Sequence, residues 1–123
     1  MTQIFMYNIT GKKAIEIKNI CRVLNIGYRV IEENAFGYKL CYLIGMSDDD
    51  SKGDSGLFNN EMLYLIDFSD GLLNIFLKLL RSKKCPVALK AVSTEININY
   101  TSFELYNEIS AEHMAMQSGE RFH

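Results

Sequence analysis

Short apolar runs alternate with helical patterns along the chain and divide it into two similar halves. The run at Ile4–Ile9 is rich in branched and aromatic residues, and so is the run at Leu63–Phe68, 59 positions later. Such runs are typical of buried strands. Thr10 and Ser69 follow the two runs at the same offset, and both residue types favour helix N-caps. Each half therefore predicts a strand that leads into a helix.

Both predicted helices carry apolar residues three and four positions apart, as an amphipathic helix does. In the first half these residues are Ala14, Ile17, Ile20, Cys21 and Leu24, and in the second half Leu72, Phe76 and Leu79. Gly27 and Pro86 then break the helical pattern. We expect second strands over residues 28–32 and 87–91.

Two strand–helix–strand units in sequence predict an α+β fold with a four-stranded sheet, arranged as a ferredoxin-like β-α-β repeat. The alternative is a small doubly wound α/β sheet. The connection between the units, residues 34–61, is long enough for either topology. Within it we expect a short helix at Phe36–Gly45 and an acidic loop over residues 46–60, which contains three consecutive aspartates.

A further helix is expected over residues 101–116. Thr101 and Glu104 have the spacing of a capping box, in which each side chain accepts from the backbone N–H of the other residue. One face of this helix gathers Leu105, Tyr106, Ile109, His113 and Met116. Residues 117–123 are expected to form a flexible tail. We expect residues 1–123 to fold as a single domain.

The second repeat helix has more apolar surface than one sheet contact uses, because Leu73, Ile75, Leu77 and Leu80 lie outside its main stripe. A second cover is therefore expected. The C-terminal helix is the preferred cover, and a homodimer is the alternative.

Composition excludes several protein classes. Of 123 residues, 48% are hydrophobic and 23% are charged, with a net charge of −2, which does not fit intrinsic disorder. No apolar stretch approaches the roughly 20 residues of a membrane-spanning helix. The three cysteines contain no C-x-x-C pair, and the N-terminal residues do not resemble a secretory signal. We therefore expect a cytoplasmic protein with reduced thiols.

Basic residues, Arg81 and Lys84 among them, gather on and beside the two repeat helices, yet the chain is acidic overall. It contains no helix-turn-helix spacing, GXXG loop or aromatic RNA-binding strand. We therefore expect a solvated basic surface, with weak, salt-sensitive nucleic-acid binding by these helices as the alternative.

The polar stretch after the last predicted strand is the preferred binding site. Its candidate ligand-binding residues are Lys90, Thr94, Glu95, Asn97 and Asn99. Small polar groups at the carboxyl end of a strand are a common place for ligand contacts. The alternative is a turn in which the same side chains hydrogen-bond to the local backbone.

Glu104, Glu108 and Glu112 form a stripe on the C-terminal helix, with His113 adjacent to it. Metal binding by Glu108, Glu112 and His113 is considered and not favoured, because His113 projects about 100° away from the stripe. No P-loop or EF-hand spacing is present, and no cofactor is expected.

Several positions match a bacterial family of small domains. They are Leu89-Lys90-Ala91-Val92, Thr94-Glu95-x-Asn97, Tyr100-Thr101, Leu105, Glu108 and Glu112-His113. Over residues 86–114 the chain resembles the family named domain of unknown function 3783, although the family has tryptophan where this chain has Tyr100. The resemblance implies that the clusters at 90–97 and 108–113 are part of a family signature. It implies no activity.

Two hypotheses for function follow. The first is a non-catalytic binding or regulatory module that uses the polar turn at residues 90–100 to bind a small ligand or a protein partner. The second is a small hydrolytic or metal-dependent enzyme that uses Glu95, Glu108 or Glu112. An enzyme would require one of these carboxylates in a concave pocket beside a second ionisable group.

Overall fold

β1 (Gln3–Tyr7) and β3 (Met62–Ile66) form the centre of a four-stranded sheet in the computed structural model, which describes residues 1–119. β2 (Gly27–Val30) lies beside β1, and β4 (Leu89–Val92) lies beside β3. Both outer pairs are parallel, whereas β1 and β3 are antiparallel. The sheet is therefore mixed, and the predicted α+β class with four strands is confirmed.

The ferredoxin-like strand order is not confirmed. A split β-α-β unit inserts another strand between its two parallel strands, whereas here β1 pairs directly with β2 and β3 with β4. The antiparallel centre also differs from the all-parallel sheet of the alternative. Each helical connection returns the chain to the adjacent strand, so the two β-α-β units meet only through β1 and β3.

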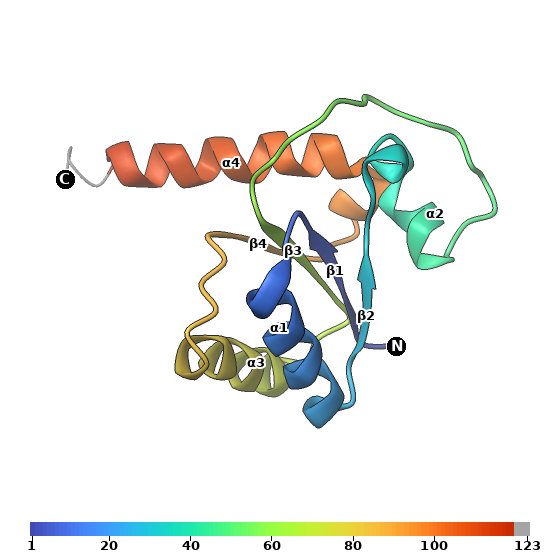
Figure 1. Cartoon of the computed structure of the whole chain (residues 1–123). Coiled ribbons are helices and arrows are strands. Elements are labelled where there is room, and N and C mark those ends of the chain that lie inside the picture. The colour runs from blue at the N-terminus through green and yellow to red at the C-terminus, as the bar shows by residue number, and fades with distance from the viewer. Residues whose placement is uncertain (120–123) are drawn as a thin grey trace. The chain divides into compact units, whose positions relative to one another are not determined.

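The helices α1 (Gly11–Leu24) and α3 (Asp70–Ser82) cover the same face of this sheet (Figure 1). Ser69 caps α3, because its hydroxyl accepts from the Leu72 N–H at 3.2 Å. Thr10 occupies the N-cap position of α1 without a side-chain cap bond. The core between sheet and helices includes Ile4, Met6, Ile17, Ile20, Cys21, Leu63, Leu65, Phe76 and Leu80.

The backbone confirms the internal repeat at the predicted offset of 59 residues. Asn8 and Asp67 have φ angles of 60° and 61°, and Asn25 and Lys84 have φ angles of 58° and 55°. These four residues adopt the left-handed conformation that is uncommon outside glycine. Both pairs are 59 positions apart, so the turns before and after each helix are alike.

The halves differ in the connection from helix to second strand (Figure 1). Tyr28 and Lys90 are equivalent, because they pair with the equivalent residues Ile4 and Leu63. Tyr28 comes three residues after Asn25, whereas Lys90 comes six residues after Lys84. The second connection is thus three residues longer, and β4 begins later than predicted.

The chain divides into two compact units. The sheet, α1 and α3 belong to the first unit, residues 1–31 and 60–93, and residues 32–59 and 94–119 belong to the second. The second unit contains two 3-10 turns, η1 (Glu33–Ala35) and η2 (Asn97–Asn99). The single-domain organisation stays a prediction.

The second unit also contains the helices α2 (Leu40–Ile44) and α4 (Ser102–Gly119). α2 is shorter than the predicted helix at Phe36–Gly45, and the loop after it, residues 46–60, contains no named helix or strand. α4 reaches Gly119, so residues 117–119 are helical in place of the expected tail. The rest of that tail, residues 120–123, lies outside the described part of the chain.

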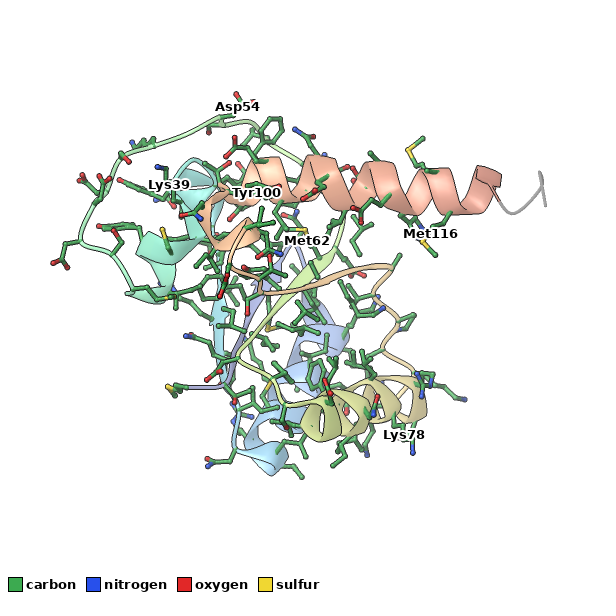
Figure 2. The ribbon with its side chains drawn as sticks, turned by 180° about the vertical axis from the view of Figure 1, so that it is seen from behind. Lys39, Asp54, Met62, Lys78, Tyr100 and Met116 are labelled. Atoms are coloured by element: carbon green, nitrogen blue, oxygen red, sulfur yellow. The ribbon has the colours of Figure 1, made fainter. Side chains whose placement is uncertain are left out.

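The predicted capping box at the start of α4 is present. Glu104 Oε1 accepts from the Thr101 N–H at 2.8 Å, and Thr101 Oγ1 accepts from the Glu104 N–H at 3.1 Å. The Thr101 hydroxyl also donates to the Asp54 carbonyl at 2.6 Å, which attaches the acidic loop to this end of the helix. Tyr100 and Asp54 are labelled in Figure 2.

Apolar packing on α3 leaves some of its surface open. Leu72, Leu73, Leu77 and Leu79 are partly buried against the core of the first unit, whereas Ile75 is 48% exposed. Cover by the C-terminal helix or by a second subunit stays a prediction. Among residues 1–119, no helix combines the length and apolar character needed to cross a membrane.

Candidate ligand-binding pocket

The predicted polar site is divided between the two units. Lys90 lies on β4 in the first unit, and Thr94, Glu95, Asn97 and Asn99 belong to the second. Their use as a ligand site stays a prediction.

Residues 94–99 form a turn that is satisfied by its own side chains. Asn97 Oδ1 accepts from the Thr94 N–H at 2.8 Å, and Thr94 Oγ1 accepts from the Asn97 N–H at 3.0 Å. Asn99 Nδ2 donates to the Glu95 carbonyl at 3.1 Å. Three of the predicted ligand-binding side chains therefore serve the local backbone, as the capped-turn interpretation expects. Glu95 is exposed.

The glutamate stripe of α4 is arranged around Tyr100. Glu104 is the capping residue, and Glu108 accepts a hydrogen bond from the Tyr100 phenol. The charge of Glu108 is the largest cause that raises the pKa of Tyr100, and Glu104 and Glu112 add smaller contributions. Tyr100, Glu104, Asn107 and Glu108 line an open hollow. Within the described residues, no three His, Cys, Asp or Glu side chains are grouped to hold a metal ion.

A more enclosed pocket lies in the first unit, where the end of α3 and the long connection meet β4. Its volume is about 550 Å³, within the usual range for small-molecule sites. Its apolar lining consists of Leu77, Leu80, Pro86, Val87 and Ala88. The last three residues belong to the longer connection, so the pocket exists because that connection departs from its counterpart in the first half.

Three cations also line the pocket. Arg81 comes from the last turn of α3, Lys84 from the left-handed turn after it, and Lys90 from β4. Burial is the main cause that lowers the pKa of Lys90, and the neighbouring charge of Arg81 lowers it further. The ion pairs identified among the described residues, Met1–Asp67 and Lys13–Glu61, include none of the three.

The wall of the pocket is held by two lysine contacts. Lys13 Nζ donates to the Pro86 carbonyl at 2.8 Å and pairs with Glu61 at 2.6 Å. Lys90 Nζ donates to the Val87 carbonyl. These two hydrogen bonds satisfy the carbonyls of Pro86 and Val87 and fix the position of the connection, which forms one wall of the pocket.

Cys85 lines the same pocket and is buried. Burial, followed by the charge of Glu16, raises the pKa of its thiol. A thiol with a raised pKa stays protonated at neutral pH and is a poor nucleophile. The groups presented by the lining are therefore suited to binding.

Sequence reasoning identified Lys90 but not the pocket around it. Arg81 and Lys84 were predicted to be part of a solvated basic surface, and Pro86 was predicted to be a helix breaker. No sequence signal located the pocket, because the two second strands were predicted at the same offset of 59 residues and the longer connection follows only from the strand register.

No curated protein and no solved structure matched the chain. The family described as "Domain of unknown function (DUF3783)" matches residues 61–116, a segment of less than half the chain that includes every residue named above as lining the pocket. The resemblance expected from the sequence is therefore confirmed at this segment: residues 61–116 are similar to the DUF3783 family.

Proposed function

We propose that this chain is a non-catalytic binding module whose α3–β4 pocket takes a small ligand with an apolar body and a negative charge. The observation that carries the proposal is the combination of an apolar lining with Arg81, Lys84 and Lys90 in a single pocket. Apolar contact would favour the body of the ligand, and the cations would select its charge.

Electrostatics supports an anionic ligand. Gathering three positive charges costs free energy, because like charges repel more strongly where water is partly excluded. Burial is the main cause that lowers the pKa of Lys90, and the charge of Arg81 lowers it further. An anion in the pocket would offset the repulsion, and its binding would in turn favour the charged form of Lys90.

The enzyme hypothesis places catalysis on Glu95, Glu108 or Glu112. These carboxylates belong to the second unit, and Glu108 is hydrogen-bonded to Tyr100. The pocket in the first unit instead combines cations with apolar side chains and a protonated thiol. The proposed function is therefore binding.

The test compares three probes by NMR titration of the whole chain. Cyclohexylacetate has both an apolar body and a carboxylate, acetate lacks the body, and cyclohexylmethanol lacks the charge. We expect cyclohexylacetate to bind at least tenfold more tightly than either of the others, because each contribution is worth more than about 1.4 kcal/mol. Equal affinity for all three probes, or no binding of cyclohexylacetate, would contradict the proposal.

Variants locate the binding. Arg81→Met and Lys90→Met should each weaken cyclohexylacetate binding by about tenfold. Lys78→Met is the matched control, because Lys78 is an exposed lysine of α3 outside the pocket lining (Figure 2). An equal loss in the control would show that general surface charge is responsible, and the proposal would be wrong.

A further inference from the structure

In the first half of the repeat, the Tyr28 ring lies beside Lys18 and Arg22 at the position where the second half has its pocket. These three residues are called the Tyr28 cluster. Arg22 Cζ lies 5.7 Å from the centroid of the Tyr28 ring, and Lys18 Nζ lies 5.8 Å from it. Arg22 Nη2 also donates to the Tyr28 hydroxyl at 3.0 Å. Two cations therefore contact one ring, an arrangement that is favourable because the ring faces are electron-rich.

The equivalent residues of the second half line the pocket. At the offset of 59 residues, Leu77 corresponds to Lys18 and Arg81 to Arg22. The strand register makes Lys90 the counterpart of Tyr28. All three counterparts are lining residues. The second half thus keeps the arginine and has no aromatic ring for it.

Two sequence differences open this space. Lysine replaces tyrosine on the strand, so the ring is absent, and the connection is longer by the three residues Pro86, Val87 and Ala88. Leucine at position 77 replaces a second cation with an apolar side chain. The resulting pocket has an arginine on the helix, an apolar wall and two lysines.

We propose that the ligand of this pocket is a small aromatic carboxylate whose ring contacts Arg81 as the Tyr28 ring contacts Arg22. This inference rests on the proposed function and names the ligand class. A planar guanidinium stacks on aromatic faces better than an ammonium does. Leu77 and Leu80 provide apolar contact for the ring, and Lys84 and Lys90 attract the carboxylate.

The test measures the affinities of phenylacetate and cyclohexylacetate by calorimetry on the whole chain. The two probes carry the same charge and have similar sizes, so their difference reports the aromatic ring. We expect phenylacetate to bind about fivefold more tightly. Equal affinities would overturn the inference and leave the proposed function standing, whereas no binding of either probe would overturn both.

The conservative variant Arg81→Lys separates stacking from charge. It should reduce the preference for phenylacetate from about fivefold to about one, while cyclohexylacetate keeps its affinity within about twofold. An unchanged preference would contradict the role of Arg81. Lys78→Arg is the matched control and should leave both affinities unchanged.

A double variant restores the arrangement of the first half. Leu77→Lys combined with Lys90→Tyr should fill the pocket with its own tyrosine ring and weaken phenylacetate binding by at least tenfold. Circular dichroism checks that the variant is folded, and Lys90→Tyr alone replaces it if it is not. Retention of full phenylacetate affinity in the folded variant would overturn the inference.

Discussion

Tyr100 shows how the helix that follows a residue influences its titration. It precedes the first turn of α4, and its phenol lies beside the glutamate stripe. A negative charge beside a phenol disfavours the phenolate, because the two anions would repel. The phenol therefore stays protonated to a higher pH than a free tyrosine, whose pKa is 10.0.

Replacing the dominant charge should reverse this effect. Glu108→Gln is expected to lower the pKa of Tyr100 toward 10.0, since the largest cause of the shift is removed. Any stability that the raised pKa provides is fully present below pH 10 and is lost as the pH rises through the raised value. The measurement is an NMR titration of the Tyr100 Cζ resonance between pH 8 and 12.

Glu112→Gln is the matched control, because Glu112 contributes least among the three glutamates. It removes the same charge one helical turn further on and should shift the pKa of Tyr100 much less. If the two variants shift it equally, a contact with Glu108 is not the cause.

The sequence identified the polar side chains of the turn at residues 94–99, but it did not decide whether they contact a ligand or the local backbone. Thr94 and Asn97 have residue types that suit both ligand contacts and turns. Only the folded backbone shows that each accepts from the N–H of the other. The capping box at Thr101 and Glu104 was predictable in full, since it depends on residues only three positions apart.

At the scale of elements, close packing of a loop against a helix side chain determines where the loop can carry a side chain of its own. In the second unit, a Cβ atom on Gly56 would lie 2.6 Å from the ring of Phe103. Nearby, the Phe58 ring stacks on Phe36 and Tyr106 at centroid distances of 4.7 and 4.2 Å. With the Phe103 ring in this position, the loop follows its path because position 56 lacks a side chain.

A pair of glycine substitutions tests this packing. Gly56→Ala should lower the free energy of unfolding by about 1–3 kcal/mol through overpacking. Gly71→Ala should raise it by about 0.5 kcal/mol, because Gly71 lies in α3 with no atom within 4 Å of its Cβ position and alanine favours helices. Urea denaturation measures both, and a Gly56→Ala variant as stable as Gly71→Ala would show that the loop does not pack on Phe103.

Element types were easier to predict than their pairing. Strand and helix patterns are local, so the order of β1, α1, β3 and α3 followed from hydrophobic spacing. Strand order depends on contacts between distant residues, which is why the ferredoxin-like arrangement was expected and direct pairing of β1 with β2 was found. The pocket was unpredictable for the same reason, since it depends on the path of the connection before β4.

At the scale of the whole chain, duplication provides an internal comparison. The two β-α-β units share the positions of their first strands, their helix starts and their left-handed turns. The first half has the partly exposed Tyr28 ring beside Lys18 and Arg22 of its helix, and the second half has a pocket at the equivalent position. The first half, which has Tyr28, therefore serves as an internal reference for the pocket of the second half in any binding experiment.

The most direct measurement of ligand binding in the α3–β4 pocket is a map of backbone amide shifts in a titration with phenylacetate. We predict saturable shifts concentrated between Leu77 and Lys90, with the amides of Lys18, Arg22 and Tyr28 unchanged. Shifts centred on the Tyr28 cluster, shifts spread evenly over basic residues, or no saturable shift would contradict it.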